Sequence, residues 1–171
     1  MAYAAFSVSF GEQPSAAKWN ILGTNDSSFN DGTGSPLSGA ATANVAASET
    51  TTSTNYTTAG FTALAVTVTV PNDGKLLIGY GASQTFNNTS AAFTWLTPVV
   101  SGANTLAASD AYAAHWQSSS SNLESGVSRT ILLTSQTAGS TTITVNYKVQ
   151  TGGGGAGTGT WINRNLWAVP F

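Results

Sequence analysis

The chain has 171 residues, a length that suits one domain with a sizeable core and a short additional segment. Only 7% of the residues are charged and the formal net charge is −2, so no basic patch is available to bind nucleic acid through its phosphates. The absence of cysteine excludes disulfides and thiolate metal sites. A surface made polar by Ser, Thr, Asn and Gly favours a durable, packed extracellular or particle-bound structure over a free cytosolic protein.

The first 48 residues differ in pattern from the rest. The stretch Phe6–Phe10 alternates between apolar and small residues, which predicts a short first strand. A short helix is predicted over Pro14–Leu22, with proline near its start and Gly23 as its stop. Residues Thr24–Ser48 are rich in Gly, Ala, Ser and Asn and show little periodicity, so we expect an extended arm or a long ordered loop.

From about Thr50 onward the pattern is typical of β-strands. Apolar residues occupy alternate positions in FTALAVTVTV, KLLIGYGA, VSRTILL and TTITVNYKVQ, and PNDG at 71–74 predicts a turn. The apolar faces predicted in this way comprise Leu64, Val66, Val68 and Val70; Leu76, Ile78 and Tyr80; Val127, Ile131 and Leu133; and Ile143, Val145, Tyr147 and Val149. With weaker runs near Phe93, Val100 and Ala111, we expect about eight to ten strands.

These patterns predict an all-β protein. Its expected architecture is a jelly-roll-like antiparallel β-sandwich over residues 49–171, preceded by an extended N-terminal arm, residues 1–48, with one short helix. In the last strand, strict alternation places Trp161, Trp167, Val169 and Phe171 on one face. Arg164 falls on the other face. If it is buried it must be paired, because an unpaired internal charge costs several kcal/mol.

Two parts of the sequence resemble a known group of proteins. The stretch GEQPSAAKWNILGTNDSSFNDGTG, residues 11–34, resembles an N-terminal motif of tail-fibre-like and minor structural proteins of tailed bacteriophages. The β part, from YTTAGFTALAVTVTVPNDGKLLIGYGA through RTILLTSQTAGSTTITVNYKV to GTWINRNLWAVPF, looks like the jelly-roll domains of such proteins, which resemble the trimeric tumour-necrosis-factor-like fold. The resemblance implies that LTSQTAGSTTITVNYKV is the penultimate hairpin and that GGGGAGTGT leads into the final strand.

The resemblance implies a non-enzymatic virion structural protein. It would form a homotrimer and contact other virion proteins of the capsid or the tail. The repetitive shaft of a long fibre is missing, which favours a short appendage, a decoration protein or a tip subunit. We expect synthesis in the host cytoplasm, since no signal peptide is visible, and no membrane insertion, since no run reaches the roughly 20 apolar residues of a span.

The N-terminal arm is predicted to dock the jelly roll onto a larger virion assembly. Its expected anchors are the large apolar residues Phe6, Phe10, Trp19, Ile21, Leu22 and Phe29. The alternative is that the arm folds back on its own jelly roll.

No catalytic, cofactor or metal site is predicted. His115 is the only histidine, and Asp110 precedes it by five residues, so in a strand the two side chains point to opposite faces. A glycan hydrolase would need two placed carboxylates, but the acids lie mostly in predicted turns or in the arm. The DGTG segment that follows Asp26 and Asn30 lacks the alternate ligand positions and the closing Glu of a calcium loop.

Three aromatic residues in the uncharged middle of the chain allow two interpretations. Trp95, Tyr112 and Trp116 are expected in the core or at a subunit interface, and the last two share a face if residues 110–116 form a strand. The alternative is a platform on which sugar rings of a host-surface glycan stack, as a receptor-binding tip would need.

Overall fold

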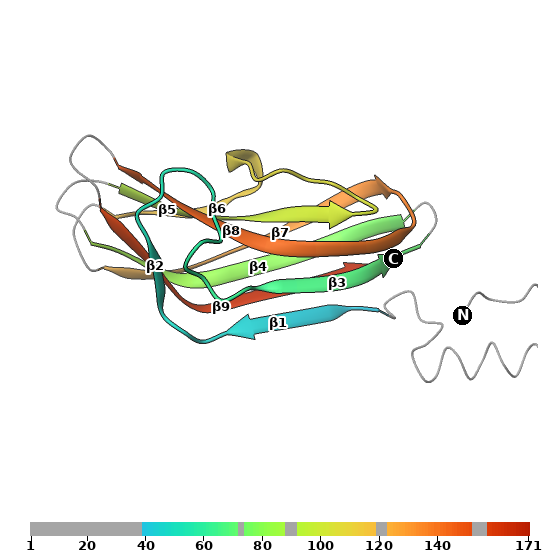
Figure 1. Ribbon diagram of the computed structural model, residues 1–171, viewed down its shortest axis with the longest axis horizontal. Coiled ribbons are helices and arrows are strands. Elements are labelled where there is room, and N and C mark those ends of the chain that lie inside the picture. The colour runs from blue at the N-terminus through green and yellow to red at the C-terminus, as the bar shows by residue number, and fades with distance from the viewer. Residues whose placement is uncertain (1–38, 72–73, 88–91, 119–122, 152–156) are drawn as a thin grey trace, which may run out of the picture. The chain divides into compact units, whose positions relative to one another are not determined.

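The computed structural model describes residues 39–71, 74–87, 92–118, 123–151 and 157–171 (Figure 1). The chain divides into two compact units, Met1–Gly39 and Ala40–Phe171, and the described residues belong almost wholly to the second. The predicted helix, the six arm anchors, the acidic segment around Asp26 and most of the glycine-rich loop therefore lie outside the described residues.

Nine strands and one turn of 3-10 helix make up the described part. The strands are β1 (Ala41–Val45), β2 (Glu49–Thr51), β3 (Ala65–Val70), β4 (Gly74–Asn87), β5 (Ala92–Gly102), β6 (Ala114–Ser118), β7 (Glu124–Gln136), β8 (Gly139–Thr151) and β9 (Thr158–Pro170). The helical turn, η1, spans Asp110–Tyr112. No described helix is long and apolar enough to cross a membrane.

The strands form two antiparallel sheets that face each other (Figure 1). Sheet A has the order β1-β9-β4-β7, with β2 also paired to β9, and sheet B has the order β3-β8-β5-β6. Pairing runs from the two ends of this unit inward: β1 with β9, β3 with β8, β4 with β7 and β5 with β6. This is the winding of a long antiparallel ribbon folded into a jelly roll, so the predicted all-β class and sandwich are confirmed.

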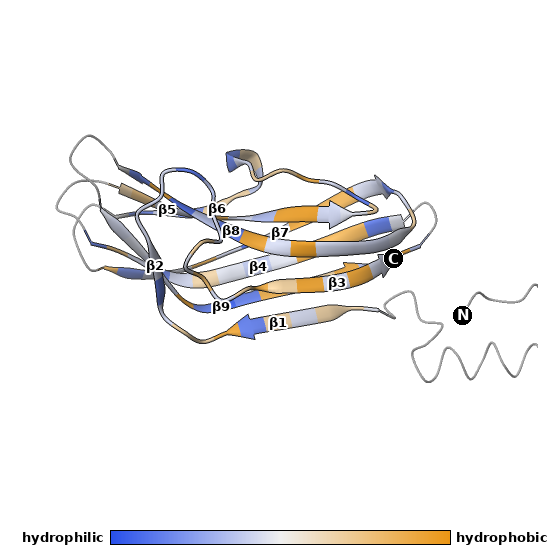
Figure 2. Cartoon of the chain, viewed as in Figure 1, coloured by the Kyte–Doolittle hydropathy of each residue, from blue (hydrophilic) through white to orange (hydrophobic). Residues whose placement is uncertain are grey.

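The predicted alternation of the strands builds the core. In β3 every second residue is buried, from Val66 to Val70, while the threonines between them are exposed. The apolar faces predicted for β4 and β8 are buried as well, including Leu76, Ile78 and Tyr147. Figure 2 shows hydrophobic and paler positions alternating along β3 and β8. The two inner faces therefore supply a single apolar layer between the sheets.

Two predictions about local structure are wrong. The predicted penultimate hairpin does not exist, because β7 and β8 follow each other in the chain but belong to different sheets. Jelly-roll winding pairs β7 with β4, so the chain after Gln136 crosses to the opposite sheet. Residues 110–116 are not one strand either, since η1 ends at Tyr112 and β6 begins at Ala114. In addition, β1 lies within the stretch predicted to be arm or loop, where alanines and asparagine give a weak pattern.

The prediction for the faces of the last strand is wrong for its first half: Trp167 and Val169 share the outward face as predicted, but Trp161 does not. Gly81 pairs with Asn165 and Ser83 pairs with Ile162, so β9 carries one more residue than β4 across this step. The extra residue is accommodated at Asn163, whose φ is +51°. Such a bulge reverses the parity of the strand, so Trp161 and Arg164 both point into the core while Trp167 points outward.

Candidate functional site

Arg164 is the most unusual charge in the described part of the chain. Its side chain is 0% exposed, in the middle of β9 and surrounded by the sandwich core. It forms an ion pair with Glu49 of β2, and it donates hydrogen bonds to the Tyr147 hydroxyl at 3.2 Å and to the Thr62 carbonyl at 3.3 Å. The condition derived from the sequence, that a buried Arg164 must be paired, is therefore met by Glu49.

Aromatic rings complete the environment of this guanidinium. The Arg164 Cζ lies 5.2 Å from the ring centroid of Phe61 and 5.4 Å from that of Tyr147. Phe61 and Tyr147 are stacked with centroids 4.2 Å apart, and the edge of Trp161 meets both rings. Contact with ring faces compensates part of the lost hydration of the cation. We call Glu49, Phe61, Tyr147, Trp161 and Arg164 the arginine cluster.

The carboxylate of Glu49 is held by groups on both sides. The Thr62 backbone N–H and its hydroxyl both donate to Glu49 Oε1, at 2.9 and 2.5 Å. Burial alone would raise the pKa of Glu49, but the Thr62 hydrogen bonds and the Arg164 charge outweigh it, so the pKa lies below its usual value. The carboxylate therefore stays ionised, and the arrangement fixes the segment from β2 to Thr62 onto the sandwich.

A second charge cluster lies on the outer face of sheet B. The Lys148 ammonium donates to Asp110 Oδ1 at 2.5 Å, and the Tyr56 hydroxyl donates to the same oxygen at 2.8 Å. The hydrogen bond from Lys148, followed by that from Tyr56, lowers the pKa of Asp110. Burial and the Asp110 charge raise the pKa of Tyr56. Asp110 is thus occupied as an acceptor and remains ionised, which leaves it no role as a proton donor at neutral pH.

His115 does not complete a catalytic arrangement with Asp110. Its imidazole is stacked on the indole of Trp95, with ring centroids 4.3 Å apart and planes 24° apart. The hydrogen-bond donors to Asp110 are Lys148 and Tyr56. No group of three or more His, Asp or Glu residues able to hold a metal ion occurs among the described residues.

The three aromatic residues predicted as core, interface or glycan platform are not brought together. Trp95 pairs with His115 on one side and with Lys148 on the other, and the Lys148 ammonium lies 5.0 Å from the ring centroid of Trp95. Both faces of this indole are therefore covered by its neighbours. Trp116 pairs with Thr94 and points to the opposite face of sheet B. Tyr112 lies in η1, where its carbonyl accepts a hydrogen bond from the Tyr80 hydroxyl.

A shallow hollow on sheet A carries no acid or base. It has a volume of about 290 Å³ and is lined by Ala82, Ser83, Gly126, Val127, Ser128, Asn163 and Asn165. A Cβ added at Gly126 would meet no atom within 4 Å, so the glycine leaves part of this space open. Hydroxyl and amide groups line it, so the hollow offers hydrogen bonds but no group for acid–base or nucleophilic chemistry.

Only part of the arginine cluster could be predicted from the sequence. Arg164 in an apolar strand indicates that a partner exists, but Glu49 lies 115 residues away in the sequence. One indication was present: Glu49 is the single acidic residue between Asp31 and Asp73. Choosing it would have required the pairing of β2 with β9, which places Glu49 opposite Trp161.

No protein-family model matches this sequence, and no curated protein matches it either. Among solved structures, a chain in the structure of infectious bursal disease virus, Gt strain, aligns with a TM-score of 0.44 and 12% identity over 75% of this chain and 31% of the viral chain. A chain from the Gx strain gives a TM-score of 0.37 and 11% identity over 77% and 37% of the two chains. This chain spans about a third of the length of those viral chains. At these values the similarity supports no particular function.

Proposed function

We propose that the chain is a non-enzymatic structural subunit of a tailed-bacteriophage virion. It is a short appendage, decoration or tip protein, assembles as a homotrimer through its jelly roll, and attaches to capsid or tail proteins through its N-terminal residues. The resemblance of residues 11–34 to phage structural proteins and the jelly-roll winding support this proposal.

The observation that carries the proposal is where the charged side chains of the described residues find their partners. Glu49 with Arg164 and Asp110 with Lys148 form ion pairs inside single subunits, and Arg129 donates to the Ala113 carbonyl at 2.9 Å. These groups hold the fold together. The outward positions of β4 and β7 between Lys75 and Glu124 carry no charge, and a face depleted in charge is typical of the centre of a subunit interface.

A receptor-binding tip that recognises a host-surface glycan is the alternative. It receives no support from the three predicted aromatics, because both faces of Trp95 are covered and Trp116 points to the other side of the sheet. A sugar ring needs an open aromatic face for stacking. The assembling subunit is therefore the stronger proposal.

Attachment is assigned to the residues that precede β1. The anchors Phe6, Phe10, Trp19, Ile21, Leu22 and Phe29 lie there. Full burial of each side chain would contribute roughly 1.5–3 kcal/mol. Ordering an extended segment costs about 1–2 kcal/mol per residue, so docking is favourable only along a prepared groove of a partner protein.

The test of the proposal is the protein content of the particle. Virions purified on a density gradient from an infection that produces this chain should contain it in a fixed ratio to the major capsid protein, measured by quantitative mass spectrometry. A structural subunit is retained through repeated purification and high salt, because its contacts are mostly uncharged. If the chain is washed away, or is found only in the infected-cell lysate, the proposal is wrong.

A further inference from the structure

One connection of the sandwich passes from one sheet to the other. β2, which begins at Glu49, pairs with β9 in sheet A, and β3 pairs with β8 in sheet B. Figure 1 shows the chain between them as a loop that leaves β2 and returns to β3. We call residues 52–62 of this connection the strap.

The strap buries little apolar surface. None of its residues is fully buried, and its two large rings, Tyr56 and Phe61, are partly buried. Its backbone joins β8 where Thr57 and Tyr147 exchange two hydrogen bonds of 2.9 Å. A segment with few buried apolar contacts opens at a lower cost in free energy than a core strand does. Polar contacts therefore decide whether the strap stays closed.

Glu49 holds the end of the strap. Its Oε1 accepts hydrogen bonds from the Thr62 backbone N–H at 2.9 Å and from the Thr62 hydroxyl at 2.5 Å, and its other oxygen pairs with Arg164 of β9. The Tyr147 hydroxyl of β8 accepts a hydrogen bond from the same guanidinium at 3.2 Å. Arg164 and Tyr147 are the charged and titratable groups that face Glu49 in the described part of the chain.

Arg164 favours opening of the strap once Glu49 is neutral. Its side chain is 0% exposed, and its Cζ lies 5.2 Å from the ring centroid of Phe61, which belongs to the strap. The guanidinium cannot lose its proton in a protein. Without an ionised Glu49, hydration is what compensates this buried charge. Water reaches Arg164 when Phe61 and Thr62 lift from the sandwich.

Asp110 of η1 holds the middle of the strap. Its Oδ1 accepts hydrogen bonds from the hydroxyl of Tyr56, a strap residue, at 2.8 Å and from the ammonium of Lys148 at 2.5 Å. The hydrogen bonds from Lys148 and Tyr56, together with the charges of Lys148 and of His115 on β6, outweigh burial, so the pKa of Asp110 lies below its usual value. Protonation of Asp110 removes the ionised acceptor that holds Tyr56.

We infer that the strap is released by acid: when Glu49 and Asp110 are protonated, residues 52–62 lift from the sandwich while the two sheets stay paired. Release uncovers Arg164 and the ring of Tyr147, against which Phe61 is stacked in the closed chain. The sheets stay paired because their alternating apolar faces remain buried between them. The inference is independent of the proposed virion role.

The sign of the pH dependence follows from the two carboxyl groups. Each has a pKa below its usual value in the closed chain. The stability that they give to the closed strap is therefore fully present above their pKa in the open state, and it is lost as the pH falls through their pKa in the closed state. The equilibrium constant for opening rises about tenfold for each unit by which closing lowers either pKa.

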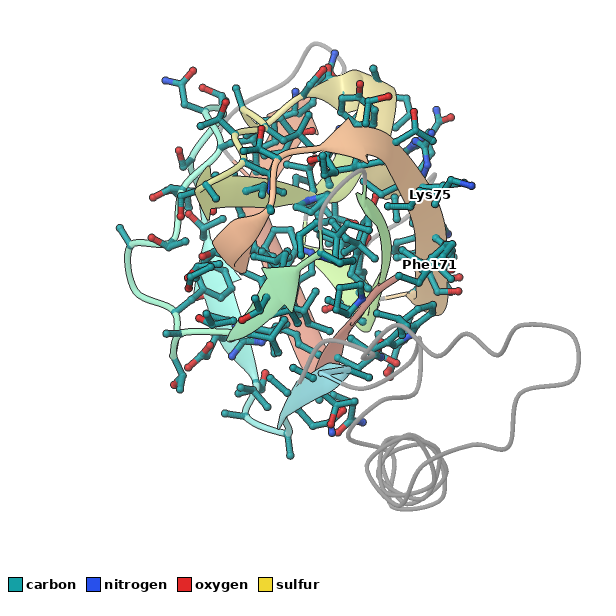
Figure 3. The ribbon with its side chains drawn as sticks, turned by 90° about the vertical axis from the view of Figure 1, so that its right-hand side faces the viewer. Lys75 and Phe171 are labelled. Atoms are coloured by element: carbon teal, nitrogen blue, oxygen red, sulfur yellow. The ribbon has the colours of Figure 1, made fainter. Side chains whose placement is uncertain are left out.

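The contact of Lys75 with Phe171 serves as an internal reference. The two residues exchange backbone hydrogen bonds of 2.7 and 3.0 Å, and the Lys75 ammonium lies 5.9 Å from the Phe171 ring centroid. Figure 3 shows them close together at one end of the sandwich. Neither ion pair among the described residues involves Lys75. Release of the strap should therefore leave the protection of the Lys75 amide unchanged.

The test is hydrogen exchange of the full-length chain, resolved by residue with NMR at neutral pH and in acid. Exchange rates are converted to protection factors, which removes the intrinsic effect of pH, and circular dichroism reports whether the sheets persist. In acid, the amides of Thr57 and Thr62 should lose their protection, while those of β4, Lys75 included, should keep it.

A substitution imitates protonation at neutral pH. Glu49→Gln removes the charge at nearly constant size and should lower the protection factors of Thr57 and Thr62 by about tenfold or more, because Arg164 loses its counter-ion. Glu124→Gln changes an exposed glutamate of β7 in the same way and should leave both protection factors unchanged.

Three results would overturn the inference. The first is loss of protection in the strap and in β4 together in acid, because the chain then unfolds as one unit. The second is a strap that keeps its protection in acid, and the third is an equal effect of Glu49→Gln and Glu124→Gln. If Glu49→Gln does not fold, Asp110→Asn decides at neutral pH: it should lower the protection of Thr57 but not that of β4, and an unchanged value for Thr57 contradicts the inference.

Discussion

Glu49→Ala is expected to lower the free energy of unfolding by about 3–5 kcal/mol, because it leaves a buried cation without its counter-ion. Arg164 is 0% exposed, and its remaining polar contacts are the Tyr147 hydroxyl and the Thr62 carbonyl. Neither of them carries a compensating negative charge. Chemical denaturation, followed by circular dichroism and fluorescence at constant protein concentration, measures the loss.

The matched control removes both charges together. The double variant Glu49→Leu with Arg164→Met fills the same volume with apolar side chains and should lose less stability than Glu49→Ala alone, since desolvation of the ions is no longer required. If Glu49→Ala costs less than about 1 kcal/mol, as exposed ion pairs do, Arg164 has another partner and the described arginine cluster is wrong.

The ion pair of Glu49 and Arg164 makes the free energy of unfolding depend on pH. The pKa of Glu49 lies below its usual value in the folded chain, so the unfolded chain binds a proton at this carboxylate at higher pH than the folded chain does. The stability that the ionised Glu49 contributes is therefore fully present above the pKa of Glu49 in the unfolded chain. It is lost as the pH falls through the pKa of Glu49 in the folded chain. In the double variant Glu49→Leu with Arg164→Met, this part of the loss of stability at low pH should be absent.

Trp161→Ala is expected to cost about 3–5 kcal/mol, the range for removing a large aromatic side chain from a core. Trp161 is 0% exposed, and its ring meets Phe61 and Tyr147 with centroids 5.6 and 5.4 Å away. Removing Trp161 also removes a contact of the Phe61 and Tyr147 rings, which lie beside the Arg164 guanidinium. The midpoint of urea denaturation should fall with little change in slope.

Leu123→Ala provides the comparison for this variant. Leu123 is 51% exposed and lies just before β7, so its truncation should change the stability by no more than about 0.5 kcal/mol. If Trp161→Ala proves equally mild, the indole lies outside the core. The parity reversal at Asn163 would then be wrong as well, because it is what places Trp161 inside.

The sequence predicted the strands in which apolar and polar residues alternate regularly. Alternation of valine with threonine identified β3, and the same period identified β4 and β8, because each of these strands buries one face. The hollow on sheet A was not predicted, since it depends on which glycines and serines the pairing of β4, β7 and β9 brings together.

The features that the sequence missed depend on contacts between distant residues. One additional residue at Asn163 reverses the last strand, and no residue type near it demands a bulge. The turn after β7 looks like a hairpin turn, but whether two strands pair or part into different sheets is decided by their other neighbours. Glu49 could be assigned to Arg164 only after β2 was placed beside β9.

The central claim, a virion subunit attached through its N-terminal residues, is tested most directly by incorporation of a truncated chain. The deletion removes residues 2–38 and stops before β1, because β1 pairs with β9 and belongs to the sandwich. The measurement is the amount of full-length and truncated chain in purified particles, each produced at the same level during infection. The account predicts that the truncated chain folds and forms the same oligomer but is missing from particles that contain the full-length chain. Equal incorporation of both chains would contradict it.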